Sequence, residues 1–353
     1  MSRNHNRIGE RSRIRFQHWL LAFLVVGLMV GSSEAQSSKR ITLRIPSKAG
    51  AMLQPIAVTE PPGFEVTKTF PLLVSLHTWS GNWQQRNPEL EAAASEREWL
   101  VVQPNFHGPN RQPLACGSHE AQIQILEAVQ WCCEHYPVDR RRIYLTGVSG
   151  GGHMTLLMAG RYPHVWAAAS AWVGISDLKK WHQFHDAKGG RYAIDLVESC
   201  GGRPGASEAV DREYFFRSPL NFLAAATHLP LDIAAGIHDG HTGSVPVSHS
   251  LEAFNEIARA NGDPGFTPQE IEAWCKRMLE PAHEPMEDPV WKRDVHLRRR
   301  SGEARVTLFE GGHEGLATAA MDFLSKHRKE QPTEFDKRTL SPSPASGEMR
   351  HTK

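Results

Sequence analysis

The chain has 353 residues, and 40% of them are hydrophobic, which is enough to bury the core of one large domain or two ordinary ones. Its 40 basic and 39 acidic residues nearly cancel, so the charge gives no sign of a nucleic-acid partner and none is expected. No internal repeat is found.

The first 35 residues have the three parts of a secretory signal peptide. Arginines at positions 3, 7, 11, 13 and 15 precede an uncharged segment, residues 19–33, with an apolar core. Ser33 and Ala35 then place small residues at the two positions that signal peptidase recognises. We expect cleavage after Ala35, export to the periplasm or the medium, and no membrane partner afterwards. The alternative is an uncleaved anchor, but the apolar run is shorter than the roughly 20 residues of a membrane span.

The five cysteines matter because disulfides persist in an exported protein. Cys132 and Cys133 are adjacent in a predicted helix and cannot easily pair with each other. Cys116, Cys200 and Cys275 lie in or beside loops where a bridge can form, although sequence alone does not give the pairing. The chain has no C-x-x-C spacing, so no structural zinc site is expected.

Strand and helix patterns alternate along the chain. Residues 41–45 and 53–59 are expected to be antiparallel edge strands. Apolar runs typical of buried strands follow at residues 71–77, 99–103, 143–145 and 166–173, and two later strands are expected at residues 231–237 and 305–309. Helical spacing of apolar residues occurs at residues 88–98, 118–136, 154–160, 245–260 and 315–326. This order predicts an α/β fold with a mostly parallel sheet flanked by helices and with functional loops at the carboxyl ends of the strands.

Two segments interrupt the alternation. Residues 176–229 have no clear period, and we interpret them as a cap over the functional edge of the sheet. Within them, the Trp-His-Gln-Phe-His run at 181–185 could line a substrate cleft, but an amphipathic helix of the cap is the more frequent explanation. A second insertion, at about residues 261–302, begins a short helix with a capping-box-like Thr267 and Glu270. One domain is therefore expected at residues 36–327, followed by a disordered polar tail at 328–353.

A glycine-flanked serine stands between a predicted strand and a predicted helix, in Gly147-Val148-Ser149-Gly150-Gly151. The glycines let the backbone turn so sharply that the hydroxyl stands out above the sheet edge. The pattern G-x-S-x-G arises by chance in roughly one chain of this length in ten, so its context has to support it. Because the strand precedes it and the helix follows it, we predict that Ser149 is a nucleophile and not part of a structural turn.

A serine nucleophile needs a base to take its proton and an acid to orient that base. His313 follows the last predicted strand and is the expected base. The alternative is that His313 is an ordinary histidine of a surface loop without a catalytic role. Asp239, just after the strand that ends at Ile237, is the expected acid, and Asp177, after the preceding strand, is its rival. The order Ser149, Asp239, His313 is that of the α/β-hydrolase arrangement.

Three motifs together resemble the catalytic domain of the prolyl oligopeptidase family and, nearly as closely, secreted α/β-hydrolase esterases. They are the serine motif at 147–151, Gly-Ile-His-Asp at 236–239 followed by Val-Pro at 245–246, and Gly-Gly-His-Glu at 311–314. The resemblance covers about residues 65–326 and leaves the two insertions unmatched. It implies an α/β-hydrolase fold at 36–327 with Ser149, Asp239 and His313 as the catalytic triad.

The chain departs from this family at one place. Family members usually have two residues between the acid and Val-Pro, whereas here residues 240–244 supply five. Spacing counted from Val-Pro would put Thr242 at the acid's position, and spacing counted from the preceding glycine puts Asp239 there. We favour Asp239, because the strand fixes its position and a loop can absorb extra residues.

Acyl transfer also needs N–H donors for the developing oxyanion. The expected donors are the backbone N–H of Gly150 and that of Thr78 or Trp79, in the loop after the strand at 71–77. Peptidases of the family often have a tyrosine hydroxyl here, and this loop has none. His238 and His241 flank the expected acid, but two histidines without a third ligand seldom bind a metal, so neither a metal nor a cofactor is expected.

Together these features predict an exported serine hydrolase that cleaves an ester or amide bond through an acyl-enzyme on Ser149. The resemblance implies a peptidase. The region before residue 65 is too short for the propeller that restricts access in the large family peptidases, which favours a carboxylesterase for small esters or acetylated or feruloylated saccharides. The alternative from another class is a binding protein on a hydrolase scaffold; the intact serine and histidine argue against it.

Overall fold

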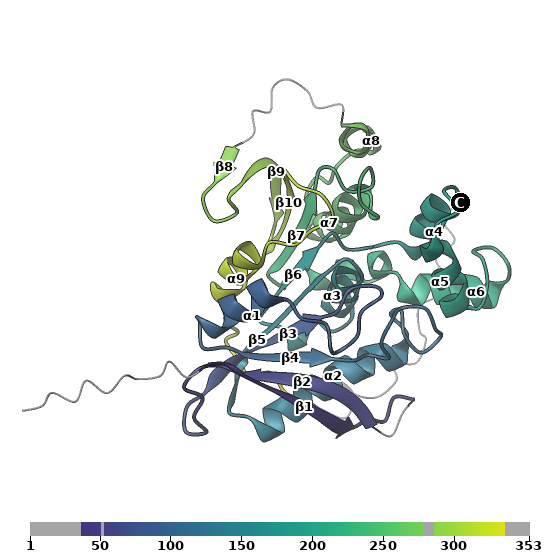
Figure 1. Cartoon of the computed structure of the whole chain (residues 1–353). Coiled ribbons are helices and arrows are strands. Elements are labelled where there is room, and N and C mark those ends of the chain that lie inside the picture. The colour runs from purple at the N-terminus through teal and green to yellow at the C-terminus, as the bar shows by residue number, and fades with distance from the viewer. Residues whose placement is uncertain (1–36, 51–52, 278–285, 336–353) are drawn as a thin grey trace, which may run out of the picture. The chain divides into compact units, whose positions relative to one another are not determined.

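The computed structural model describes residues 37–50, 53–277 and 286–335, and every structural statement below concerns these residues (Figure 1). The expected signal peptide at 1–35 and residues 336–353 of the expected tail lie outside them. Within the described ranges, no helix combines the length and the apolar character that a membrane crossing requires.

A ten-stranded sheet runs through the described region in the order β1-β2-β4-β3-β5-β6-β7-β10-β9-β8 (Figure 1). The strands are β1 (Lys39–Pro46), β2 (Leu53–Glu60), β3 (Phe70–Leu76), β4 (Leu100–Pro104), β5 (Val138–Val148), β6 (Ala168–Trp172), β7 (Leu231–Gly236), β8 (Met286–Asp288), β9 (Arg293–Ser301) and β10 (Ala304–Phe309). From β4 through β10 neighbouring strands are parallel, while the pairs at both edges are antiparallel. The prediction of a mostly parallel sheet is confirmed.

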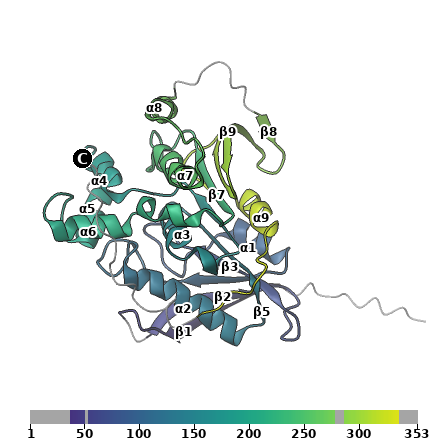
Figure 2. The ribbon, with the colours of Figure 1, turned by 180° about the vertical axis from the view of Figure 1, so that it is seen from behind.

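The helices of the described region are α1 (Pro88–Ser95), α2 (His119–His135), α3 (Gly150–Arg161), α4 (Leu178–Asp186), α5 (Arg191–Cys200), α6 (Glu208–Arg217), α7 (Ser248–Asn261), α8 (Pro268–Lys276) and α9 (Ala317–Ser325), with short 3₁₀ turns at Pro163–Val165, Pro219–Asn221 and Leu223–Ala226. Five of them, α1, α2, α3, α7 and α9, cover the two faces of the sheet. The larger apolar core lies between the sheet and α2, α3 and α7, and α2 and α3 stand in front of the sheet in Figure 2. A smaller core joins the opposite face to α1 and α9, which lie side by side.

Residues 176–229, the cap, form helices that the sequence did not delimit. Both views show α4, α5 and α6 grouped together to one side of the sheet (Figures 1 and 2). The run at 181–185 belongs to α4, whose buried residues are Leu178, Trp181, His182 and His185. Their spacing of three, four and seven residues places them on one face of the helix. The expected amphipathic helix is therefore confirmed.

The expectation of an irregular insertion at about 261–302 is wrong for its second half. The short helix is present as α8, and the capping box between Thr267 and Glu270 is confirmed. Residues Arg293–Ser301, however, form β9, which pairs with β10 and widens the sheet. Its sequence hides this, because arginines occupy half-buried positions: the Arg298 guanidinium lies 5.1 Å from the ring centre of Trp291 and also pairs with a carboxylate. Long cationic side chains can cover apolar surface in this way.

The expected disordered tail begins too early in the prediction. Residues 328–335 pack against the start of β5, where the Lys329 N–H donates to the carbonyl of Arg141 and the Thr333 N–H donates to that of Arg140. Thr333 is 1% exposed. These hydrogen bonds join residues nearly 200 positions apart, so no local sequence pattern could predict them.

All five cysteines lie in the described region and are unpaired. Cys116 and Cys200 are buried in one apolar cluster under the cap. Burial raises the pKa of the Cys116 thiol to about 11, which keeps it protonated near neutral pH. The structure therefore contains none of the bridges that the loop positions allowed.

Candidate active site

Ser149 occupies a strained turn between β5 and α3. Its backbone has φ +60° and ψ −116°, outside the regions that a non-glycine residue ordinarily adopts, and its N–H donates to the carbonyl of Trp172. A Cβ added to Gly147 would lie 2.5 Å from the carbonyl carbon of Gly151, and one added to Gly151 would lie 2.3 Å from the carbonyl oxygen of Leu76. The two glycines are thus required by close backbone packing, which lifts Ser149 to the carboxyl ends of the strands.

Asp239 and His313 are brought together although 74 positions separate them in the sequence. The Nδ1 atom of His313 lies 2.7 Å from Oδ2 of Asp239. The other carboxylate oxygen accepts the N–H groups of Gly240, at 2.9 Å, and Val245, at 3.0 Å. The Asp239 residue is 2% exposed. A buried carboxylate with these partners fixes the ring so that Nδ1 carries the proton and Nε2 is left as an acceptor.

Tight packing between the two loops places this pair. A Cβ on Gly236, at the end of β7, would lie 2.4 Å from the carbonyl carbon of Gly311, so the loop after β10 runs directly beside the end of β7. The His238 N–H donates to the Gly311 carbonyl at 3.0 Å and ties the loops together. Strands β7 and β10 are adjacent and parallel, so the loops that follow them meet at the same edge of the sheet.

Asp177, the rival acid, has another role. Its Oδ1 accepts the backbone N–H groups of Lys179, at 2.9 Å, and Lys180, at 3.1 Å, and so caps α4. Aspartate is among the preferred residues at this position of a helix. Of the two candidate acids, the structure brings only Asp239 to His313.

Ser149 and His313 stand at the same edge of the sheet. A Cβ on Gly315, two residues after His313, would lie 2.6 Å from a methyl carbon of Val148, the residue before the serine. In the described region the Ser149 hydroxyl has no hydrogen bond, and Nε2 of His313 instead lies 3.3 Å from the hydroxyl of Ser244. Sequence reasoning missed Ser244, although the long spacing between Asp239 and Val-Pro was a signal that additional residues lie here.

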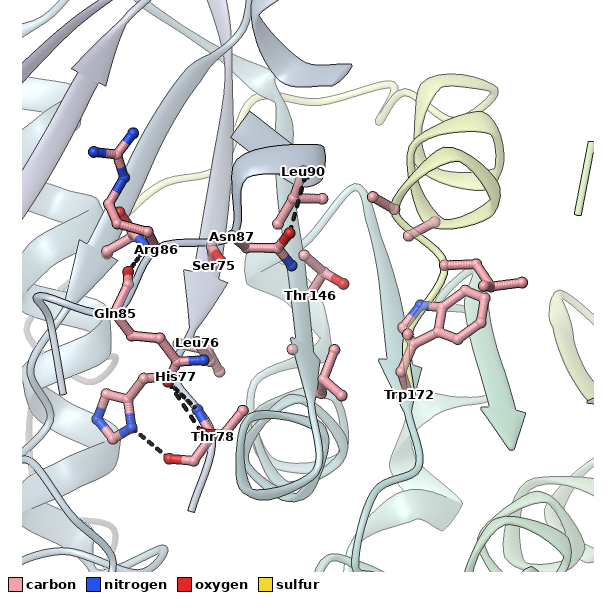
Figure 3. A pocket seen from close by; sticks show the side chains of 17 residues that line it. Ser75, Leu76, His77, Thr78, Gln85, Arg86, Asn87, Leu90, Thr146 and Trp172 are labelled. Carbon is pink, nitrogen blue, oxygen red and sulfur yellow. Dashed lines mark hydrogen bonds between the residues drawn. The ribbon is translucent and has the colours of Figure 1, made fainter. Parts of the chain in front are cut away.

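The structure distinguishes between the two oxyanion candidates. The Thr78 N–H donates to Oε1 of Gln85 at 3.0 Å, a contact drawn in Figure 3. A Cβ on Gly150 would lie 2.4 Å from the backbone nitrogen of Trp79, so the Trp79 N–H stands directly beside the residue after the serine. Because the Thr78 N–H is already engaged, the Trp79 N–H is the donor that remains to pair with that of Gly150.

A small cavity lies behind this loop, between the ends of β3 and β5 and the start of α9 (Figure 3). Its volume is about 40 Å³, and its walls include His77, Thr78, Gln85 and Trp172. Ligand pockets usually measure about 300–1,000 Å³, so this space can hold ordered water but not an acyl group. Ser149 is not among the residues that line it, so this cavity is not the acyl-binding site.

The two histidines that flank Asp239 have separate partners. The His238 ring pairs with Glu310, whose second oxygen lies 2.9 Å from Nε2 of His296. The His241 ring contacts the carbonyl of Cys275 at 2.7 Å. Among the residues that the structure describes, no cluster of three or more histidine, cysteine, aspartate or glutamate side chains could hold a metal ion.

The fold is that of an α/β-hydrolase, and a histidine–aspartate pair, His313 and Asp239, lies at the sheet edge where the strained turn holds Ser149. Residues 117–266 match the sequence profile of the prolyl oligopeptidase family, over less than half of the chain. Solved structures with this fold include the acylaminoacyl peptidase of Pyrococcus horikoshii, which is 17% identical in sequence and has a TM-score of 0.59. The match covers 86% of this chain and 44% of the peptidase. A puromycin-hydrolyzing peptidase of Mycobacterium tuberculosis is 20% identical and has a TM-score of 0.53, and the match covers 65% of this chain and 35% of that peptidase. The resemblance to this family is confirmed, and the structural likeness establishes the fold.

Curated relatives of the chain include esterases. Feruloyl esterase B of Talaromyces stipitatus is 23% identical over 187 residues, which are 50% of this chain and 45% of the relative. Acetylxylan esterase A of Emericella nidulans is 41% identical over 51 residues, which are 14% of this chain and 17% of the relative. The chain thus spans less than half the length of these relatives.

Proposed function

We propose that the chain is a serine hydrolase that cleaves an ester or amide bond through an acyl-enzyme on Ser149. The observation that carries the proposal is the 2.7 Å hydrogen bond between His313 and the buried Asp239 at the sheet edge where the strained turn holds Ser149. The family match and the esterase relatives agree with it.

The proposed reaction follows from the positions of these groups. His313 Nε2 takes the proton of the Ser149 hydroxyl while the serine oxygen bonds to the substrate's carbonyl carbon. The N–H groups of Gly150 and Trp79 stabilise the negative charge on the carbonyl oxygen. The imidazolium then returns the proton to the leaving alcohol or amine as its bond to carbon breaks. Water repeats the sequence, releasing the acid and restoring the serine hydroxyl.

We favour a carboxylesterase that acts on acetylated or feruloylated saccharides or on small esters. The curated relatives are named feruloyl esterase and acetylxylan esterase. The second candidate is a peptidase, which the family match over residues 117–266 favours. The same proposal includes export by cleavage after Ala35, and the mass of the mature protein recovered outside the cytoplasm tests this step.

A fluorophosphonate probe tests whether the chain is an enzyme, because it forms a covalent bond with an activated serine. We expect labelling of the wild type, its loss in Ser149→Ala, and its retention in Ser325→Ala, where an exposed serine of α9 is changed. Absence of labelling in folded wild-type protein would favour a binding protein on a hydrolase scaffold.

A panel of substrates then distinguishes an esterase from a peptidase: 4-nitrophenyl acetate, methyl ferulate, an acetylated xylo-oligosaccharide and an acyl-peptide anilide. Turnover of the anilide alone would identify a peptidase.

A further inference from the structure

The hydroxyl of Ser244 occupies the site on His313 that the nucleophile needs. It lies 3.3 Å from Nε2, while Nδ1 is bonded to Asp239. A neutral imidazole with its proton on Nδ1 has one lone pair, on Nε2, so here the Ser244 hydroxyl is the donor. Ser149 must donate to the same lone pair before it can attack, and the two hydroxyls therefore compete for it.

The cap fixes the position of Ser244 through its backbone. The Ser244 carbonyl accepts the Nε1–H of Trp181 at 2.8 Å and lies 2.9 Å from Nε2 of His185; both side chains come from α4. Burial lowers the pKa of His185, so its ring is neutral near pH 7 and donates from Nε2. Trp181 is fully buried among apolar residues of the cap.

The five residues that separate Asp239 from Val-Pro form the loop that carries Ser244. Both ends of the loop are anchored on Asp239, which accepts the N–H groups of Gly240 and Val245. Gly243 passes so close to the pair that an added Cβ would lie 2.1 Å from an oxygen of Asp239 and 2.7 Å from Cβ of His313. The loop therefore wraps the acid and the base closely, and the long spacing seen in the sequence is what brings a hydroxyl to Nε2.

The same cap helix also contacts the oxyanion loop. The rings of Trp181 and Trp79 meet edge to face with their centres 4.6 Å apart, and the Trp79 Nε1–H donates to Asp195 of α5 at 3.1 Å. One aromatic side chain of the cap thus contacts both the loop that holds Ser244 and the residue whose backbone nitrogen lies beside Gly150.

We propose that Ser244 is a positioning residue through which the cap holds the base of the resting enzyme, in competition with Ser149. This inference rests on the proposed function. The distance of 3.3 Å exceeds the usual 2.7–2.8 Å of a hydroxyl donor, so the contact is weak and readily exchanged for the Ser149 hydroxyl when a substrate binds. Ser244 affects the first step, acylation, by setting how often Nε2 is available to Ser149.

The second-order rate of fluorophosphonate labelling measures this availability. Removing the competing hydroxyl in Ser244→Ala should raise the rate about two- to fivefold, since the hydrogen bond it removes is longer and weaker than a usual one. Ser244→Thr, which keeps a hydroxyl, should return the rate to the wild-type value. If Ser244 had only a structural role, Ser244→Ala would label more slowly than the wild type, and a hydroxyl at this position in Ser244→Thr would not by itself give the wild-type rate.

Each outcome decides the inference. An unchanged or slower rate in folded Ser244→Ala overturns the role of Ser244 and leaves the proposed function intact. A wild type that is not labelled overturns the proposed function and this inference with it. If Ser244→Ala has no cooperative thermal transition, Ser244→Cys takes its place, because a thiol is a weak donor of similar size; its rate should also rise, and a fall would refute the competition.

Discussion

Asp239→Asn tests the proposed acid, because the hydrogen bonds around Asp239 predict how the side-chain amide of the variant will be oriented. Asp239 accepts three hydrogen bonds, from Gly240, Val245 and His313. An asparagine carbonyl can keep the two backbone donors, which come from its own chain neighbourhood. Its NH₂ group then faces Nδ1 of His313, and a donor at that place forces the ring proton onto Nε2.

A base with its proton on Nε2 cannot take the proton of Ser149. The corresponding change in a serine protease lowers kcat about 10⁴-fold while the geometry persists, and we expect a loss of about 10³- to 10⁴-fold here. Single-turnover release of 4-nitrophenol from 4-nitrophenyl acetate measures it, and a thermal melt confirms that the variant is folded. A drop of less than about tenfold in a folded Asp239→Asn protein would refute the assignment of the acid.

Asp177→Asn is the matched control, since it makes the same chemical change at the rival position. Asparagine is as good an N-cap as aspartate, so α4 should retain its cap and activity should stay within about twofold of the wild type. If this variant alone loses turnover, Asp177 is the acid and the proposed triad is wrong.

Two further changes test the loop and the buried core. Gly243→Ala should lower the rate of acylation at least tenfold, because the added Cβ would lie 2.1 Å from a carboxylate oxygen of Asp239. Gly262→Ala is the control: this position is open, with φ +78°, so the change should cost only about 1 kcal/mol of stability and leave activity unchanged. Full-rate Gly243→Ala would show that the loop is not packed as described. Burial lowers the pKa of His77 and His153 to about 4 and that of His249 to about 3, so the unfolded chain takes up protons first as the pH falls below 6.5. The stability that these neutral rings contribute is complete above pH 6.5 and should fall by about 4 kcal/mol per pH unit toward pH 4, which urea unfolding at pH 7, 6 and 5 measures; an unchanged midpoint contradicts it.

The sequence by itself determined the features that depend on local backbone requirements. The strained turn at Ser149 needs small residues at Gly147 and Gly151, and a strand on one side and a helix on the other leave the serine little choice of conformation. The alternation of apolar runs and helical patterns gave the parallel sheet. Because loops after parallel strands share one edge, the positions of Asp239 and His313 after their strands predicted that they would meet, although Asp177, which also follows a strand, stayed a rival until the structure showed it capping α4.

Only the tertiary structure decided what depends on contacts between distant segments. Whether the Thr78 or the Trp79 N–H is free depends on Gln85, whose side chain engages the first. The arginine-rich β9 is a strand because β10 offers it a partner edge, and residues 328–335 are ordered because β5 accepts their N–H groups. The contact of Ser244 with His313 needs a loop, a base and a cap helix from three parts of the chain. Each of these features depends on a contact with a distant part of the chain, so no sequence pattern within one segment could predict it.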